Sequence, residues 1–281
     1  MATDDKDSSE RQVRRREHRS NPASAPKPQP GTGPYAAPGD EPLTVPATLK
    51  LDEPFRFDRG VAKRLRMRQL NASEAFTLRD GSGGWFRASL REYDTRGGSA
   101  VAYERMIRSP ESTIDLTLAC AVLARQRMHL VMQKATELGV RRIMPLLTDH
   151  SVAAEAIEHE QAHAWAGHIA RAARQCRRSS LPHLLAPIGL EEFLASPLLA
   201  ATELRLFLHG RSEGPSPVPS APPRRIVLLV GPEGGFSDAE RLRLAPHAHP
   251  WVLGGRVLRA ETAVIVGLTA VQMMWGDFKN E

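Results

Sequence analysis

The chain has 281 residues, of which 41% are hydrophobic and 25% charged, a balance that is ordinary for a soluble globular protein of one or two domains. Lysine and arginine number 38 against 32 acidic residues, and the net charge of +6 favours a polyanionic partner. Two cysteines, no metal-ligand spacing, no secretory signal and no apolar run near the ~20 residues of a membrane span exclude a disulfide scaffold and a membrane protein. We therefore expect a cytoplasmic protein with no metal and no membrane partner.

Residues 1–47 contain charged residues, proline and glycine and almost no large apolar side chain. Such a stretch cannot bury enough apolar surface to offset the entropy of ordering it, so it is predicted to be a disordered tail. Its basic residues could contact RNA or simply be solvated: Arg11, Arg14, Arg15, Arg16 and Arg19.

Residues 48–110 read as a small β-barrel or sandwich. An Asp-Gly turn separates the alternating runs 75–78 and 85–90, which is typical of a hairpin, and 100–104 forms a further strand. The same region has a basic stretch that is predicted to bind the RNA backbone, with a solvated face as the alternative: Lys63, Arg64, Arg66 and Arg68.

From residue 111 to 281, strands and helices alternate, which predicts an α/β domain with a largely parallel sheet. Its first elements are a strand at 114–121, a helix at 126–138 that Gly139 ends, a strand at 140–146 and a long helix at 158–176.

A buried strand at 225–230 leads into the glycine-rich turn 231–235, and Ser237 with Glu240 forms a capping box that begins a helix. Ligands bind beyond the carboxyl ends of such strands. The turn has neither the P-loop ending nor the dinucleotide spacing, and Glu233 would repel a phosphate. It suits a cation such as the sulfonium of S-adenosylmethionine, although a tight turn without a ligand is the alternative.

A second strand end and loop occupies 251–262 and precedes an apolar helix at 263–275. Arg256, Arg259 and Glu261 lie in this loop between buried elements, where an isolated charge is costly. They either pair with each other or face a ligand cleft. His209 follows a third strand end and is a candidate for lining the same pocket.

These two segments, together with 133–140 and 65–67, resemble the signature of the SPOUT superfamily and, more narrowly, of the family of small-subunit ribosomal RNA uridine N3-methyltransferases (RsmE). The resemblance extends from Leu51 to the C-terminus. It implies a PUA-like RNA-binding β-barrel followed by a SPOUT-type α/β domain with a C-terminal trefoil knot. It also implies a homodimer, with the helix 264–275 near the interface, that uses S-adenosylmethionine to methylate N3 of a uridine in 16S ribosomal RNA of the small subunit.

The resemblance also implies site residues. The matching positions of the cofactor pocket are Gly231, Pro232, Glu233, Gly234, Gly235, Leu253, Gly254, Arg256, Val257, Leu258 and Thr262. Uracil N3 must lose a proton as it attacks, so the site needs a proton acceptor or cationic groups that stabilise the charge developing on O2 and O4. Arg259 and Arg178 are the candidate cations, although Arg178 could equally contact a phosphate, and Glu261 would orient Arg259 or act as the base.

The chain departs from the family pattern near the expected RNA contacts. Gln175 and Arg178 match, but Arg174 replaces the usual glutamate and Ala260 replaces a common threonine. These departures leave open a non-catalytic RNA-binding protein with the same fold, or a methyltransferase with a different RNA target. A Rossmann oxidoreductase is disfavoured because no dinucleotide fingerprint is present.

Overall fold

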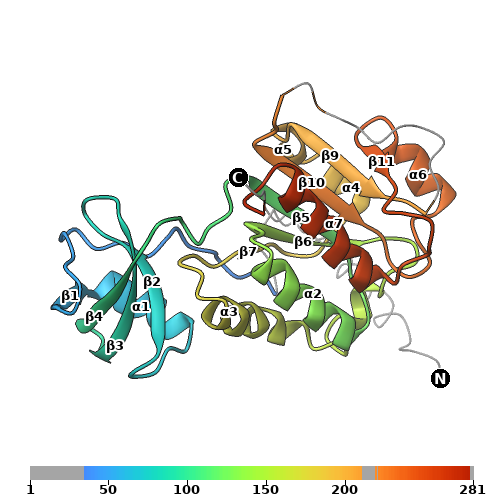
Figure 1. The fold of residues 1–281 in the computed structure, drawn as a ribbon. Helices are drawn as coiled ribbons and strands as arrows, with labels where there is room; N and C mark the ends of the chain where they lie inside the picture. The colour runs from blue at the N-terminus through green and yellow to red at the C-terminus, as the bar shows by residue number, and fades with distance from the viewer. Residues whose placement is uncertain (1–34, 211–218, 220, 279–281) are drawn as a thin grey trace, which may run out of the picture.

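The computed structural model describes residues 35–210, 219 and 221–278, and Figure 1 shows a small β-rich domain beside a larger α/β domain. No helix in these ranges is long and apolar enough to cross a membrane. Most of the predicted tail, with its basic cluster, lies outside the described residues.

The small domain is a four-stranded antiparallel sheet with one helix, in the strand order β1-β4-β3-β2. Its elements are β1 (Pro54–Asp58), α1 (Arg59–Met67), β2 (Ala75–Arg79), β3 (Trp85–Tyr93) and β4 (Gly97–Met106). The predicted hairpin is confirmed, because Asp80 accepts hydrogen bonds from the backbone N–H groups of Ser82 and Gly84 in the turn between β2 and β3. Closure of this sheet into a PUA-like barrel stays a prediction.

The last part of the predicted disordered tail is ordered, which corrects the domain boundary. Leu43 and Val45 are buried in the core of the small domain, and Ala37 bridges to Leu184 in the larger domain. Composition averaged over the tail could not predict this, because the few apolar side chains that become buried lie near its end, next to the small domain.

The larger domain has a sheet in the strand order β11-β9-β10-β5-β6-β7, with β8 also paired to β6, and all of these pairs are parallel. The strands are β5 (Asp115–Ala121), β6 (Arg142–Leu147), β7 (His183–Leu184), β8 (Ile188–Gly189), β9 (Leu204–Leu208), β10 (Arg225–Val230) and β11 (His249–Trp251). The predicted parallel α/β domain is confirmed.

Helices cover both faces of this sheet. In β10, alternate side chains point to opposite faces and pack against the helices on each side. Ile226, Leu228 and Val230 pack in one core with residues of α2, α3 and α7. Val227 and Leu229, which alternate with them, pack in the other core with residues of α4, α5 and α6. The helices are α2 (Arg125–Glu137), α3 (Trp165–Gln175), α4 (Leu190–Leu194), α5 (Pro197–Ala200), α6 (Asp238–Leu244) and α7 (Ala260–Met274), with 3-10 turns at η1 (Ala154–Ala156) and η2 (Ala162–Ala164).

Two helix boundaries differ from the prediction. The predicted helix at 158–176 begins only at Trp165, because Gln161 adopts a left-handed backbone (φ 56°) that interrupts the helix. Helix α7 begins at Ala260, so Glu261 and Thr262 lie in its first turn rather than in a loop. This places Glu261 on a rigid element next to the predicted pocket.

Candidate functional site

A cavity lies where β9, β10 and β11 end, at the carboxyl edge of the parallel sheet. Nine of the predicted cofactor residues line it: Gly231, Pro232, Glu233, Gly235, Leu253, Gly254, Arg256, Val257 and Leu258. The remaining two, Gly234 and Thr262, lie in the same loop and helix but do not line the cavity. The structure thus brings the two glycine-rich segments together, as ligand binding beyond the ends of parallel strands requires.

The cavity also has walls that the motifs did not include. His209, the candidate at a third strand end, lines it, and burial lowers the pKa of its imidazole. Apolar side chains from strand ends and from α7 form much of the remaining wall: Leu208, Val230, Trp251, Ala260 and Ala263. A largely apolar pocket with a few polar groups is the usual environment of a nucleoside-like ligand.

The glycine-rich loop is held in place by the segment that follows β6. The predicted capping box of Ser237 and Glu240 is confirmed. Glu240 is buried, and its carboxylate also accepts a hydrogen bond of 2.9 Å from the backbone N–H of Asp149. The Ser237 hydroxyl donates to Asp149 at 2.5 Å, and the His150 ring lies 3.1 Å from the Gly235 carbonyl oxygen. These contacts hold the loop against the segment that follows β6.

Two glycines have steric reasons to be glycine. A Cβ atom at Gly231 would lie 3.2 Å from the backbone nitrogen and the ring of Phe236. Gly254 has a positive φ of 107°, which side-chain-bearing residues rarely adopt. Both positions therefore present bare backbone to the cavity, as close approach by a ligand requires.

Three charged side chains from three elements meet beside the cavity. Arg127, in the first turn of α2, forms an ion pair with Glu233 of the glycine-rich loop, which raises the pKa of the guanidinium. The same guanidinium lies 4.0 Å from Glu261 Oε2, which is buried and has no hydrogen-bond partner among the described residues. Sequence reasoning missed Arg127 because it lies more than a hundred residues before both carboxylates and matches no motif.

The two loop arginines are exposed at the mouth of the site. Arg259 is the N-cap residue of α7, and Arg256 lies in the preceding loop with Val257, whose side chain is 96% exposed. Of the two alternatives for the loop charges, pairing with each other does not hold for Glu261, because its carboxylate approaches Arg127 instead of Arg256 or Arg259.

Arg178 lies elsewhere, at the amino edge of the sheet. Its buried guanidinium donates to Glu111 Oε2 at 2.8 and 3.1 Å and to the carbonyl oxygens of Thr136 and Val140 at 3.0 and 2.9 Å. Glu111 and Val140 precede β5 and β6, whereas the cavity lies beyond the opposite ends of the strands. Within one chain, this candidate catalytic residue does not reach the cavity, because its guanidinium is bound to Glu111 and to the carbonyl groups of Thr136 and Val140.

The four basic side chains of the predicted stretch in the small domain fall into two groups: two are exposed, and two are bound to other parts of the protein. Lys63 and Arg66 are exposed on α1. Arg64 donates to the backbone of Glu41 and Pro42, and Arg68 is buried, where it binds Asp40 at 2.8 Å and the carbonyl oxygen of Ser179 at 2.9 Å. Helical geometry turns these two inward, so Arg68 joins the domains and cannot reach an RNA backbone.

The other positions near the expected RNA contacts also lie at this junction. Gln175 ends α3, and Arg174 donates to the carbonyl oxygen of Gln69 in the small domain. The departure from glutamate at position 174 therefore affects a contact between the domains and leaves the cavity unchanged. Among the described residues, no group of His, Cys, Asp and Glu side chains is arranged to hold a metal ion.

Comparison with known proteins gives a consistent result. The family profile described as RNA methyltransferase domain matches residues 110–272. The ribosomal RNA small subunit methyltransferase E of Synechocystis is 32% identical over 217 residues, which cover 74% of this chain and 69% of that protein. The chain belongs to this family of RNA methyltransferases.

Two solved structures of similar proteins match this chain over almost the whole of their own length. A methyltransferase from Legionella pneumophila with bound cofactor SAM is 30% identical, with a TM-score of 0.59 over 84% of this chain and 98% of that one. The ribosomal RNA small subunit methyltransferase E from Neisseria gonorrhoeae bound to S-adenosyl methionine is 26% identical, with a TM-score of 0.62 over 85% of this chain and 100% of that one. The two structures thus match most of the chain, beyond the residues 110–272 that the family profile covers.

Proposed function

We propose that this methyltransferase uses S-adenosylmethionine to methylate N3 of a specific uridine in 16S ribosomal RNA of the small subunit. The observation that carries the proposal is the convergence of the loops 231–235 and 253–258 on one cavity at the carboxyl edge of the sheet. The family and the cofactor in the Legionella and Neisseria structures support it.

The cavity fits this cofactor on its own chemistry. We assign the adenine and ribose to the backbone of Gly231, Leu253, Gly254, Val257 and Leu258, beside apolar walls such as Trp251 and Ala263. The carboxylate of Glu233 provides the negative charge that a sulfonium favours. Pro232, Gly235, Arg256 and Thr262 complete the two segments around it.

When bound, the cofactor supplies the electrophilic methyl group, and the protein must position the uracil and deal with its N3 proton. Glu261 fits proton acceptance, because its buried Oε2 has no hydrogen-bond partner within the described residues. Arg259 begins the same helix turn and is free to approach the O2 or O4 of a bound base. We leave Arg178 out of this set because its guanidinium is bound to Glu111 and two carbonyl groups.

The family resemblance supports further parts of the proposal, namely a PUA-like barrel, a C-terminal trefoil knot and a homodimer in the cytoplasm. Helix α7 offers apolar surface for the dimer, because Met273 is 60% exposed and three further apolar side chains are also exposed, namely Val266 in the middle of the helix, Met274 at its end and Phe278 after it. Apolar side chains gathered on one helix are typical of a surface that another chain covers. Gel filtration with light scattering would reveal a monomer if this part is wrong.

The test is tritiated methyl transfer from S-adenosylmethionine to small-subunit particles and to naked 16S ribosomal RNA that lack the modification, followed by nucleoside mass spectrometry. We expect 3-methyluridine on at least one substrate and none with a Glu261→Gln variant that still binds the cofactor. Cofactor binding without any methyl transfer would instead favour a non-catalytic RNA-binding protein with this fold.

A further inference from the structure

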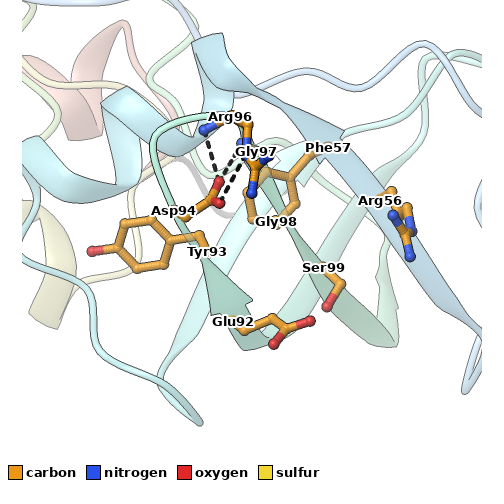
Figure 2. A pocket seen from close by; sticks show the side chains of 9 residues that line it. All are labelled: Arg56, Phe57, Glu92, Tyr93, Asp94, Arg96, Gly97, Gly98 and Ser99. Atoms are coloured by element: carbon orange, nitrogen blue, oxygen red, sulfur yellow. Dashed lines mark hydrogen bonds and ion pairs between the residues drawn. The ribbon is translucent and has the colours of Figure 1, made fainter.

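Two adjoining hollows lie on the small domain, at the end of the β3–β4 hairpin and far from the cofactor cavity in sequence. The first, of about 450 Å³, is drawn in Figure 2, and the second meets it at Glu92 and Tyr93. We call the two together the hairpin groove. Its basic lining residues are Arg56, Arg66, Arg91 and Arg96.

The shape of the groove depends on glycines at the start of β4. A Cβ atom at Gly97 would lie 2.4 Å from the Phe57 carbonyl oxygen, and one at Gly98 would lie 2.4 Å from the Glu92 carbonyl oxygen. The register of β3 against β4 also shifts between Leu90 and Glu92. Close packing of β1, β3 and β4 thus forms a fixed concave surface, which does not require a ligand to order it.

The groove carries cationic charge that the protein does not use. Arg56 and Arg91 are exposed and make no ion pair in the part of the chain that the structure describes. The acidic Asp94 is occupied inside the turn, where the backbone N–H groups of Arg96 and Gly97 donate to it and lower its pKa, and where the Arg96 guanidinium pairs with it at 3.4 Å (Figure 2). Free guanidinium groups around a hollow favour phosphate binding.

An aromatic ring stands where the two hollows meet. Tyr93 is half-buried, its hydroxyl donates to the Leu70 carbonyl oxygen at 2.9 Å, and the Arg66 guanidinium lies 5.8 Å from its ring centroid. Glu92 is exposed beside it, and its carboxylate can accept hydrogen bonds from the amino group of a base. Arginines interleaved with an aromatic ring are typical of sites for single-stranded nucleic acid, whose bases are free to stack, and a duplex would not expose its bases to the ring.

We propose that the hairpin groove binds an unpaired segment of the substrate RNA, with phosphates on Arg56 and Arg91 and a base against Tyr93. This inference rests on the proposed function for the identity of the RNA. It replaces the half-buried Arg64 and the buried Arg68 by other side chains as the RNA contacts of the small domain, and it keeps the exposed Arg66.

The test is equilibrium binding of the full-length protein to a short fluorescent single-stranded RNA and to the same sequence as a duplex, over a range of salt concentrations. Each lost phosphate contact on a single strand lowers the salt slope by about 0.7 and, at 0.1 M salt, the affinity by roughly fivefold. We therefore expect R56E/R91E to bind the single strand at least about 25-fold more weakly than the unchanged protein. The control is R105E, an exposed charge reversal at the other end of the same β3–β4 ladder, which should cost much less.

A stacking test separates a base contact from simple charge attraction. Tyr93→Leu removes the ring, and Tyr93→Phe keeps the ring but loses the hydrogen bond to Leu70. We expect Tyr93→Phe to retain single-strand binding and Tyr93→Leu to lose it by about tenfold. Thermal melting of each variant with and without S-adenosylmethionine shows that the fold and the cofactor cavity are intact.

The outcomes distinguish this inference from the proposed function. Equal RNA binding by R56E/R91E and the unchanged protein, or an equal loss in R105E, would overturn the groove even if 3-methyluridine forms normally. Conversely, a loss of single-strand binding that is confined to the groove variants would support the groove even if the unchanged protein transferred no methyl group to 16S ribosomal RNA.

Discussion

The buried pair of Arg178 and Glu111 gives the sharpest test of how the structure reassigns a predicted catalytic residue. Glu111 accepts hydrogen bonds from Arg178, from the Ser180 hydroxyl and from the backbone N–H groups of Ser179 and Ser180. Both side chains are largely buried, at 4% exposure for Arg178 and 15% for Glu111. Arg178→Ala would leave the carboxylate buried without its counter-charge. Removal of one partner from such a pair costs about 3 to 5 kcal/mol of unfolding free energy.

The assay is thermal unfolding monitored by circular dichroism, followed by methyl transfer well below the melting temperature. A loss of this size should lower Tm by roughly 10 °C in a domain of this length. The double variant R178M/E111L removes both charges together, so part of the lost stability should return; the backbone groups of Thr136, Val140, Ser179 and Ser180 still lose their hydrogen-bond partners. Because neither side chain lies at the cavity, the double variant should also retain cofactor binding and methyl transfer.

The opposite result would refute this reasoning. If Arg178→Ala left Tm unchanged but reduced methyl transfer by about 100-fold or more, the guanidinium would have a direct role in the reaction. The same conclusion would follow if R178M/E111L recovered its stability without recovering activity. The matched control is Arg224→Ala, which removes an exposed arginine side chain and keeps the hydrogen bonds that the Arg224 backbone makes with Glu203 and Asp115.

Three further predictions concern the cavity and the helix pair α2 and α3. Ala263→Leu keeps a good helix former but fills the cavity, so calorimetry should show S-adenosylmethionine binding at least about tenfold more weakly. Arg127→Met should lower cofactor affinity or kcat without changing RNA affinity, since it leaves Glu233 and Glu261 without their shared cation; unchanged kinetics would contradict this. Burial lowers the pKa of His168, which stacks on His129, to about 4, below its unfolded value. The unfolded chain therefore binds the proton first as the pH falls, so stability is complete above about pH 6.5 and is lost toward pH 4. His168→Gln should show a smaller drop in Tm between pH 7 and 5 than the unchanged protein.

Much of the fold and of the cofactor cavity could be predicted from local sequence. Periodicity and turn chemistry determined the β2–β3 hairpin, helix α2 with Gly139 at its end, the strand β10 and the capping box of Ser237 and Glu240. The glycine-rich loops were predicted as a ligand site because parallel strands end at one edge of a sheet, and the cavity at the ends of β9, β10 and β11 lies there.

Only the tertiary structure decided which charged residues lie beside the cavity and which are buried away from it. Arg127 and Arg178 look alike in sequence, yet one pairs with Glu233 at the cavity and the other is buried against Glu111 at the far edge of the sheet. Their partners lie 106 and 67 residues away along the chain, and no local pattern encodes contacts at such separations. A charged side chain takes its role from the groups that replace its water, and those groups come together only when the sheet and its helices pack.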